Sequence, residues 1–517
     1  MNANILTSDN LHTYHATCDL GSNSFHLLIV RQDEVGGDIH VIDRIKEMVR
    51  MGGGISTRGE LDKVTEERAL ACLQRFGQRL RDIPPAQVRI VGTQGLRRLG
   101  NPRKFIHAAE TALGFRIEII AGREEARLIF LGVTGFMSQP QPVTRLVVDI
   151  GGGSTEIIVG SQDQPELLES LSFGCVSLTQ KFFADGKISR RRWQSARNLF
   201  RTNFRRYKYQ YRNIDWDESV GCSGTIRAIH EVCLQQGWTS KGITRKAMLK
   251  LKDRLLDFKT IEEISLDGLS ERRRPVFIGG VILLEALFQD LDLKNMQISR
   301  WALREGVLLD LIGRYSLTDP RQQTIDQLSK RYSVDSEQVE RVWRVSSDLF
   351  GQISTDGGLK KSDRELLAWA CQVHEIGLAI SHQSYHRHSA YLIENSDMPG
   401  FSHQDQQLLA KLIISQRREL PDDLRESVPT RQKKIFLLIS IFRLSIILCR
   451  SRNDASIPDL ELELKKTKVA RLVLSLPKIW QQKHALALSD LQAETSQLEK
   501  LGFELILEND PKCNLSV

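Results

Sequence analysis

A short pattern of apolar and small residues occurs twice in this chain. Its second copy, VVDIGGGSTEIIVG from Val147 to Gly160, places Asp149 and three glycines between two runs rich in Val and Ile. Its first copy, ATCDLGSNSFHLLIV, has the same order of apolar run, Asp19, glycine turn and apolar run. Each copy predicts two buried strands joined as a hairpin. Two such hairpins, each opening a block of strands and helices, imply a duplicated fold with a shared cleft.

The glycine-rich turns indicate a phosphate site. Residues without a Cβ let the backbone approach a ligand and point its N–H groups into one concavity, which suits phosphate. A carboxylate such as Asp149 would be repelled by that phosphate unless a cation lay between them, so the pairing suggests Mg²⁺. One copy alone is equally well explained as a hairpin with a solvated aspartate. The repetition favours the phosphate site.

The bulk properties are those of an ordinary soluble globular protein. The chain has 517 residues, 41% hydrophobic and 26% charged, which predicts roughly two to four domains. Its eight cysteines are scattered, which favours a reducing cytoplasm. The formal net charge of +8 favours an anionic partner. The N-terminus lacks the basic start and apolar core of a signal peptide, so export is not predicted.

The longest apolar run, KKIFLLISIFRLSIILCRSR, is interrupted by Arg443. A membrane-spanning helix needs ~20 predominantly apolar residues. We therefore expect a buried, amphipathic helix in this stretch.

Strands alternate with helices in the first part of the chain, which predicts an α/β layer architecture. A helix is expected from about Asp62 to Asp82, and the order of elements begins again after Arg145. After Asp319 the pattern is helical almost to Asn453, and a late strand-like stretch predicts a small α+β cap. The predicted domains are residues 1–135, 136–318, 319–453 and 454–517.

Three further stretches carry candidate residues for chemistry. Glu124 and Glu125 begin a helix, where one could act as a general base on water, although acidic residues in a first turn are common. Thr93 and Arg97 follow a strand, and the arginine could bind a phosphoryl group or form a surface ion pair. The turn GCSGT leads into a helix, and its N–H groups could bind an anion or only cap the helix.

Taken together, these stretches resemble the exopolyphosphatase and guanosine pentaphosphate phosphohydrolase family, within the actin-like fold of sugar kinases and heat-shock ATPases. The resemblance runs in order through DLGSNSFHLLIV, GTQGLR, EEARLIF, VVDIGGGSTE, GCVSL, GCSGTI, ALREGVLLD and HRHSAYLIENSDMPGF. It covers nearly the whole chain. It implies a duplicated actin-like (ribonuclease H-like) α/β half with two facing domains, then an all-α HD-like domain and a small C-terminal α+β cap. The glycine triplet and the last motif look closer to the exopolyphosphatase branch.

The resemblance implies processive hydrolysis of the terminal phosphoanhydride of linear inorganic polyphosphate, with Mg²⁺. By position, Glu125 matches the family's catalytic glutamate, and Asp149 and Glu156 match the carboxylates grouped around metal and phosphate. The resemblance also implies a homodimer, in the cytoplasm or peripheral at the inner face of the membrane. The groups expected to hold phosphate are Gly21, Ser22, Asn23, Ser24, Thr93, Arg97, Gly151, Gly152, Gly153, Ser154, Ser223, Gly224 and Thr225.

Two positions depart from the family patterns. Trp301 stands where many relatives have a glycine before ALREG, which argues against nucleotide binding. In the HD-like region His374 is followed by Glu375 instead of a metal-binding aspartate, and no histidine lies between Asp319 and Val373. Because these ligands are missing, we predict a structural role for this domain.

Basic residues form two groups that could retain a long polyanion between cleavage steps. Such stripes are usually solvated faces, but a polymeric substrate makes a basic channel between the halves a reasonable expectation. The first group, on a predicted helix, is Arg197, Arg201 and Arg205. The second is Lys433, Lys434, Arg443 and Arg450.

Three alternative functions are weighed against the exopolyphosphatase. The first is hydrolysis of the 5′ phosphate of guanosine pentaphosphate, which ends in the same anhydride. The second is an actin-like sugar kinase, which would not need a glutamate poised to activate water. The third is RNA or DNA binding, because RRYKYQYR (Arg205 to Arg212) interleaves basic residues with tyrosines. Nothing else resembles a nucleic-acid module, so no nucleic-acid partner is predicted.

Overall fold

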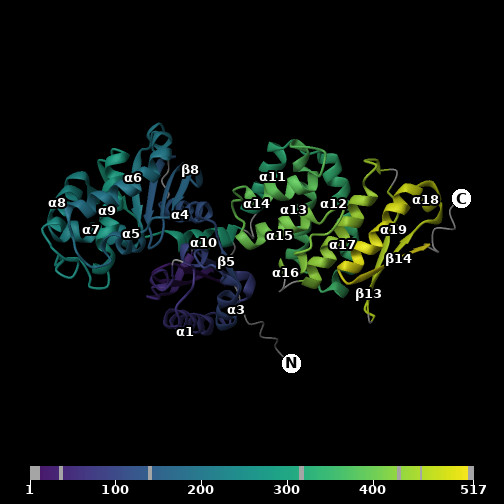
Figure 1. The fold of residues 1–517 in the computed structure, drawn as a ribbon, viewed down its shortest axis with the longest axis horizontal. Helices are drawn as coiled ribbons and strands as arrows, with labels where there is room; N and C mark the ends of the chain where they lie inside the picture. The colour runs from purple at the N-terminus through teal and green to yellow at the C-terminus, as the bar shows by residue number, and fades with distance from the viewer. Residues whose placement is uncertain are drawn as a thin grey trace, which may run out of the picture. The chain divides into compact units, whose positions relative to one another are not determined.

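The structure is a computed structural model that forms two compact units, one up to Asp319 and one from Pro320 onward (Figure 1). It describes residues 12–33, 39–56, 58–137, 142–313, 319–427, 432–454, 457–467 and 469–509. One of the eight cysteines, Cys513, lies outside these ranges.

A five-stranded sheet opens the first unit. Its strands are β1 (His12–Leu20), β2 (Phe25–Asp33), β3 (Ile39–Glu47), β4 (Val88–Gly92) and β5 (Ile117–Ile119), in the order β3-β2-β1-β4-β5. The β1–β2 pair is antiparallel, and β4 adds in parallel to the other edge of β1.

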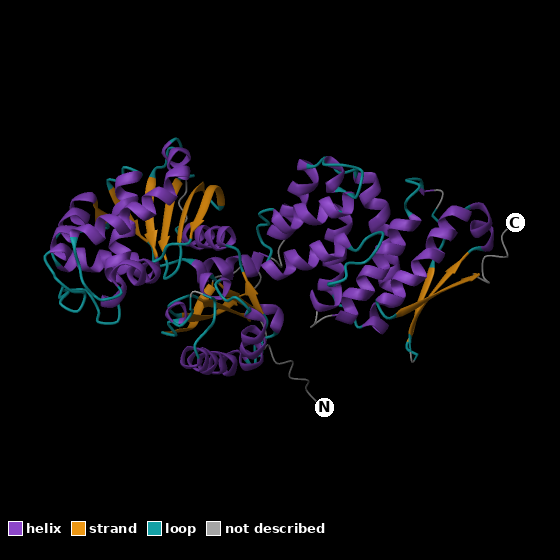
Figure 2. Cartoon of the chain, in the orientation of Figure 1, coloured by secondary structure: helices purple, strands orange, loops and turns teal. Residues whose placement is uncertain are grey.

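A six-stranded sheet follows in the same unit (Figure 2). Its strands are β6 (Thr144–Ile150), β7 (Thr155–Ser161), β8 (Gln164–Leu171), β9 (Glu218–Cys222), β10 (Ile243–Thr244) and β11 (Asn295–Ile298). Read from β8, the order β8-β7-β6-β9 repeats the β3-β2-β1-β4 order of the first sheet. The β6–β7 pair is again antiparallel and β9 is again parallel to β6. The predicted duplication is therefore confirmed.

Helices flank both sheets. They are α1 (Lys63–Leu80), α2 (Gln94–Arg97), α3 (Pro102–Leu113), α4 (Gly122–Phe136), α5 (Cys175–Phe183), α6 (Arg190–Arg212), α7 (Ser223–Gln235), α8 (Arg245–Leu256), α9 (Arg274–Asp290) and α10 (Leu303–Gly313). α1 begins close to the predicted position because the Asp62 carboxylate accepts a hydrogen bond from the Thr65 amide at 2.9 Å, which caps the helix.

One apolar cluster ties the two sheets together. It contains Val91 of the first sheet and Val147 and Ile158 of the second, with buried side chains of α4 and α10. A Cβ on Gly306 of α10 would collide with the Leu128 carbonyl of α4, so the glycine allows the two helices to approach closely. The first turn of α4 is thereby held against both sheets.

The second unit is mainly helical. Its helices are α11 (Pro320–Arg331), α12 (Ser336–Gly357), α13 (Lys361–Val373), α14 (Tyr385–Asn395), α15 (His403–Ile414), α16 (Leu424–Ser427), α17 (Gln432–Leu448), α18 (Lys478–Lys483) and α19 (Ala485–Lys500). A small sheet of β12 (Glu461–Lys465), β13 (Ala470–Leu476) and β14 (Phe503–Asn509) shares one apolar core with these helices. The HD-like assignment of the helices stays a prediction.

The long apolar run forms α17, so the prediction of a buried helix is confirmed, whereas the prediction that it is amphipathic is wrong. Every residue from Ile435 to Leu448 is buried, so the helix has no solvated face over that length. An apolar helix that is covered on all sides belongs to the centre of a large core. Nowhere in the described ranges is a helix both long and apolar enough to cross a membrane.

Candidate active site

The two glycine-rich turns adopt the same hairpin geometry. In loop 1 (Gly21–Ser24) the Gly21 amide donates to the Ser24 carbonyl at 3.2 Å, and in loop 2 (Gly151–Ser154) the Gly151 amide donates to the Ser154 carbonyl at 2.9 Å. Asp19 and Asp149 occupy the same place, one residue from the end of the strand that leads into each loop. The repeated sequence therefore produces a repeated structure.

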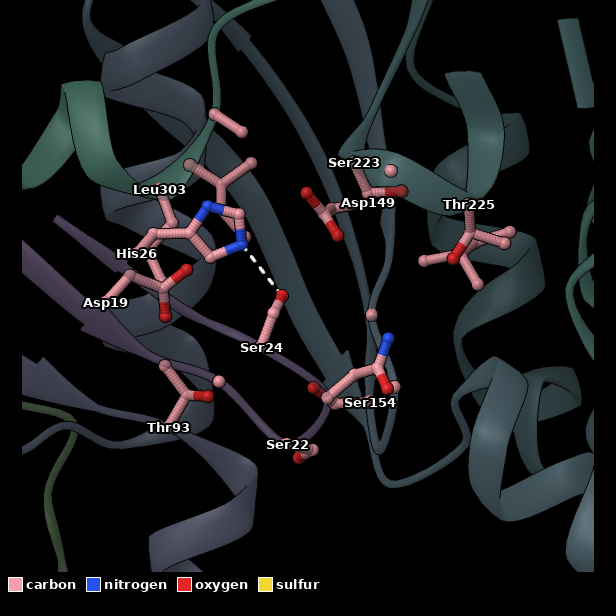
Figure 3. A pocket seen from close by; sticks show the side chains of 18 of the residues that line it. Asp19, Ser22, Ser24, His26, Thr93, Asp149, Ser154, Ser223, Thr225 and Leu303 are labelled. Carbon is pink, nitrogen blue, oxygen red and sulfur yellow. Dashed lines mark hydrogen bonds between the residues drawn. The ribbon is translucent and has the colours of Figure 1, made fainter. Parts of the chain in front are cut away.

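A cavity of about 140 Å³ lies where the two loops meet (Figure 3). It brings together predicted residues that are far apart in sequence. Both loops line it, together with Thr93, Glu125, Asp149 and the turn Ser223–Thr225. In Figure 3 the side chains of Asp19 and Asp149 approach it from the two different sheets. Two of the predicted site residues, Arg97 and Glu156, are not on its wall.

One glycine of loop 2, Gly153, is required by the close contact between the loops. Neither Gly152 nor Gly153 has a positive φ, so a left-handed backbone is not the reason for them. A Cβ on Gly153 would lie 3.0 Å from the Ser22 hydroxyl oxygen and 2.9 Å from Gln94 Cγ. A Cβ on Gly152 would only reach ordinary contact, 3.4 Å from the Cβ atoms of Ser22 and Asn23. Gly153 thus lets the second loop pack directly against the first.

Gly153→Ala is expected to raise the Kd for pyrophosphate by roughly tenfold, because the added methyl group collides with Ser22 and Gln94 and displaces the N–H groups of loop 2. A tenfold change in Kd corresponds to about 1.4 kcal/mol of binding free energy. Isothermal titration calorimetry with pyrophosphate measures this Kd. Gly151→Ala is the matched control with a smaller effect, since its Cβ would meet only the Ser154 carbonyl of its own loop, at 3.3 Å. Equal Kd values for Gly153→Ala and the unmodified protein would contradict this account.

Glu125 is held in place by Arg97. The Arg97 Nη2 donates to Glu125 Oε2 at 2.8 Å, Nη1 donates to the Ile120 carbonyl at 2.7 Å, and Nε donates to Gln94 Oε1 at 3.1 Å. All three guanidinium nitrogens therefore have protein partners. Arg97 therefore orients the carboxylate of Glu125, which lines the cavity. Its Nη1 and Nη2 each keep a second N–H, and the role of Arg97 as a phosphate ligand stays a prediction.

Glu124 belongs to a buried ion network behind the cavity. Both of its carboxylate oxygens accept hydrogen bonds from Arg127 at 2.8 Å. Arg127 also pairs with Asp310 of α10, and Arg89 of β4 donates to the same aspartate at 2.5 Å. The network connects the first turn of α4 to β4 and to α10. Of the two candidate glutamates, the structure therefore places Glu125 on the cavity and Glu124 in the scaffold.

Burial disfavours the charged forms of two carboxylates at the cavity, Asp19 and Asp149. Burial, reinforced by Glu125 and Asp149, raises the pKa of Asp19 to about 7, although Arg304 opposes the shift. Burial also raises the pKa of Asp149 to about 6, with Glu125 adding to it and a hydrogen bond from Cys222 opposing it. Among the described residues, Asp19 Oδ1 has no hydrogen-bond partner. A cation between these groups would offset their repulsion.

Glu156 faces Asp149 across the β6–β7 pair, but its side chain lies behind the cavity wall. It is 1% exposed, accepts a hydrogen bond from the Ser170 hydroxyl at 2.8 Å, and its pKa is held well above the usual range by burial and then by Glu125 and Asp149. Because Glu156 interacts electrostatically with Glu125 and Asp149, it belongs to the same group of carboxylates, and its catalytic and metal-binding role stays a prediction.

The third turn is strained in a way that capping does not require. Ser223 has a φ of 76°, a left-handed conformation that is uncommon for a residue with a side chain. Its hydroxyl accepts a hydrogen bond from the Ile226 amide at 3.3 Å, so it also caps α7. The turn therefore caps α7 and also lines the cavity, and binding of an anion by its N–H groups stays a prediction.

Seven wall residues with a charged or imidazole side chain were not predicted as site residues from the sequence. Asp19 could have been found, because it repeats Asp149 in the duplicated motif. Arg304 had a weaker signal, since it lies in the ALREG motif. The other five come from separate elements and carry no local signal: His26, Lys46, Arg227, Arg273 and Arg300. Five cationic side chains therefore face three carboxylates among the described residues of this wall.

The predicted basic channel loses several of its members. Arg443 is 1% exposed, and its guanidinium donates to Glu494 at 2.7 Å and to the Ser415 carbonyl at 2.6 Å, so its assignment to a channel is wrong. Arg450 is exposed but pairs with Asp490. At the start of α17, Lys433 is exposed and Lys434 is half-buried, 3.9 Å from Asp363.

The basic group on α6 is also largely structural. Arg201 donates two hydrogen bonds to Asp290, at 2.8 and 2.9 Å, and Arg197 lies 3.3 Å from Glu285. Both acidic partners are buried on α9. These pairs attach α6 to α9, which leaves Arg205 as the exposed member of the group.

The ring of Trp301 stacks on Phe136 with the centroids 5.6 Å apart, and Trp301 does not line the phosphate cavity. The expectation that it disfavours nucleotide binding stays a prediction. In the second unit His374 is buried and its Nδ1 contacts the Cys371 carbonyl at 2.7 Å.

Comparison with known proteins agrees with this geometry. The chain matches the sequence model of the Ppx/GppA phosphatase family over residues 28–315 and that of Ppx/GppA phosphatase, domain III, over residues 321–495. A protein of Aeromonas hydrophila named guanosine-5′-triphosphate,3′-diphosphate pyrophosphatase is 35% identical over 491 residues, 95% of this chain and 97% of that protein.

Two solved structures are similar in fold to the first unit. The crystal structure of an exopolyphosphatase from Cytophaga hutchinsonii is 25% identical, with a TM-score of 0.52, and covers 58% of this chain and 98% of its own. The Aquifex aeolicus member of the Ppx/GppA family is 23% identical, with a TM-score of 0.50, and covers 59% of this chain and 99% of its own.

Proposed function

The chain belongs to the Ppx/GppA phosphatase family, whose members are phosphoanhydride hydrolases, and on that premise we propose that it removes the terminal phosphate of linear inorganic polyphosphate. The observation that carries the proposal is the position of Glu125. Its carboxylate lines the cavity where the two loops meet, held by Arg97 at 2.8 Å. A carboxylate oriented beside bound phosphate suits the activation of a water molecule.

In the proposed reaction, Glu125 accepts a proton from water while the water oxygen attacks the terminal phosphorus. The bond between that phosphorus and the bridging oxygen breaks, and one orthophosphate and a chain shorter by one phosphate leave. Phosphoryl transfer of this kind depends mainly on positioning and charge neutralisation. Backbone N–H groups of the loops and the cationic wall residues serve those two purposes, so no nucleophilic serine or cysteine is needed.

The residues present fit a divalent cation in part. Asp19 and Asp149 are buried carboxylates with raised pKa values, and the Asp19 Oδ1 atom lacks a partner among the described residues. No three carboxylate, imidazole or thiol groups in the described ranges form a metal cluster by themselves. Mg²⁺ commonly takes one or two carboxylates, with waters and substrate phosphates completing its shell. When bound here, Mg²⁺ would neutralise charge on the phosphates.

The cationic wall favours a substrate of dense negative charge. Lys46, Arg227 and Arg273 approach one another closely enough that burial, followed by the charges of these arginines, lowers the pKa of Lys46 to about 8. Such mutual repulsion is relieved when anionic groups bind between the cations. A polyphosphate end presents such groups on consecutive phosphates. The homodimer and the cytoplasmic location stay predictions.

Hydrolysis of guanosine pentaphosphate is the second candidate, and one feature of the structure favours it. A second cavity, of about 310 Å³, shares Ser22 and Asn23 with the phosphate cavity. Apolar side chains including Phe183, Ile261 and Val276 line it. A linear polyphosphate has no apolar part to place there, whereas a purine ring would fit such a surface. The name of the Aeromonas relative points to the same class of substrate.

Orthophosphate release from long-chain polyphosphate and from guanosine pentaphosphate, measured in parallel with Mg²⁺, separates the two candidates. We expect faster release from polyphosphate, and no change in that rate when Val276→Phe fills the second cavity. Val276→Ala, which enlarges it, is the matched control. The second candidate would be selected by faster release from the nucleotide in the unmodified protein, together with a rate on the nucleotide that falls about tenfold or more in Val276→Phe. Such a fall is expected when an apolar pocket is blocked. Release from neither substrate would reject both.

A further inference from the structure

The imidazole of His26 lies between Ser24 of loop 1 and Arg304 of α10. Figure 3 shows its hydrogen bond to Ser24. His26 is on β2, two residues after Ser24, and its Nε2 is 2.8 Å from the Ser24 hydroxyl oxygen. On its other side, Nδ1 is 2.9 Å from Arg304 Nη1. All three residues line the phosphate cavity. The ring thus connects loop 1 to an element 278 positions away in sequence.

The direction of both hydrogen bonds follows from the chemistry of the groups. A guanidinium has only donors, so Nδ1 of His26 must accept the hydrogen bond from Arg304. A neutral imidazole carries one proton, which must then be on Nε2, where it is donated to the Ser24 oxygen. Because that oxygen already accepts from His26, the proton of the Ser24 hydroxyl points elsewhere.

The neutral ring is enforced by its surroundings. A protonated ring would turn the Nδ1 N–H toward the Arg304 N–H group, donor against donor. Burial, followed by the charges of Arg304 and Lys46, holds the pKa of His26 well below its usual range. Arg304 is itself fixed, since its Nη2 lies 3.4 Å from Glu305 and its carbonyl accepts a hydrogen bond from Thr17 at 3.3 Å.

We propose that Arg304 and His26 are positioning residues that make the Ser24 hydroxyl a permanent hydrogen-bond donor to the phosphate bound at loop 1. The inference rests on the proposed function, because it takes phosphate to be the ligand of this loop. A free serine hydroxyl rotates and can present either its proton or its lone pairs. Lone pairs would repel phosphate oxygens. A fixed direction of the Ser24 O–H bond therefore favours binding of the anion, because it excludes the hydroxyl orientation in which lone pairs face the phosphate.

A double-mutant cycle tests whether His26 acts through Ser24. Hydrogen bonds to charged groups contribute about 1.5–3 kcal/mol, so His26→Leu is expected to raise the Kd for methylenediphosphonate, which is not hydrolysed, by about tenfold or more. In a Ser24→Ala background the same substitution is expected to change Kd less than twofold. Equal effects in both backgrounds would overturn the proposal, because independent residues contribute additively.

Two further variants separate this role from a general effect on folding. His26→Gln is expected to recover part of the affinity, since its amide can accept from Arg304 and donate to Ser24. His107→Leu, at an exposed histidine of α3, is the matched control and is expected to leave Kd unchanged. If His26→Gln bound as weakly as His26→Leu although both variants fold, the donor relay would be rejected.

The protonation state of the ring gives a readout that does not depend on activity. Nitrogen-15 NMR of labelled histidines is expected to show His26 as the neutral Nε2–H tautomer from pH 6 to 8. A protonated ring or the Nδ1–H tautomer would overturn the relay. A protein with the Nε2–H tautomer and coupled Kd effects, but with no phosphate release from any substrate, would instead reject the proposed function and retain the relay.

Discussion

Glu125→Gln is expected to lower orthophosphate release from polyphosphate by a factor on the order of 10² to 10⁴, the usual contribution of a positioned general base. The amide keeps the shape of the side chain, and its oxygen can still accept the hydrogen bond that Arg97 donates to Glu125 at 2.8 Å. It cannot take a proton from water. Binding should therefore survive, with the Kd for methylenediphosphonate changed by less than about threefold, since binding does not need that proton transfer.

Two controls accompany this measurement. Glu67→Gln, at an exposed position of α1, is expected to have full activity. Glu124→Gln removes charge from the buried network with Arg127 and Asp310, so its main effect should be a lower free energy of unfolding, measured by urea denaturation. Phosphate release by Glu125→Gln within about threefold of the unmodified rate, well short of the loss a general base predicts, would show that Glu125 is not the base.

Asp149→Asn is expected to lower phosphate release on the order of 100-fold and to raise the Mg²⁺ concentration needed for half-maximal rate. A bound cation contributes several kcal/mol to charge stabilisation, and tenfold in rate corresponds to about 1.4 kcal/mol. Asp149 is 8% exposed and faces the cavity, so its carboxylate is placed to share such a cation with substrate phosphates. Asp82→Asn, at an exposed position after α1, is the matched control.

The raised pKa of Asp149 also predicts how its effect depends on pH. Because burial raises this pKa from 3.8 to about 6, the carboxylate ionises, and phosphate release should rise, as pH increases through about 6. Added Mg²⁺ favours the ionised form and should move this rise to lower pH. A rise at the same pH in Asp149→Asn, with an unchanged Mg²⁺ requirement, would contradict the assignment.

The same shift affects folding with a definite sign. Between pH 4 and 6 the folded state binds a proton at Asp149 that the unfolded state has lost, so the free energy of unfolding falls as pH rises through this window. The shift from 3.8 to about 6 corresponds to a cost on the order of 3 kcal/mol above pH 6. Asp149→Asn should therefore lose less stability between pH 4 and pH 8 than the unmodified protein does.

The sequence predicted the parts of the site that depend on local structure. An apolar run, an aspartate and a glycine turn specify a hairpin within a few residues, so both loops and the places of Asp19 and Asp149 could be stated in advance. The start of α4 could be predicted for the same reason, and with it the position of Glu125 in the first helical turn.

Interactions between distant segments could not be predicted in this way. Sequence spacing did not show that Arg97 donates to Glu125 and to the Ile120 carbonyl. It placed Arg443 in a channel, yet Glu494 binds that guanidinium inside the core. In both cases the guanidinium finds partners on other elements, and only the packing of those elements decides which partners lie within reach.

By itself, then, the sequence determined the duplicated hairpins, the division into an α/β half and a helical half, and the glutamate at the start of α4. Each of these features depends on the hydrophobic periodicity and the turn residues of a short consecutive segment. Only the tertiary structure decided that Lys46, Arg227, Arg273 and Arg304 converge on one cavity and that His26 bridges Ser24 to Arg304. The physical reason is that charge and hydrogen-bond partners are set by distance in space, which the packing of the two sheets establishes.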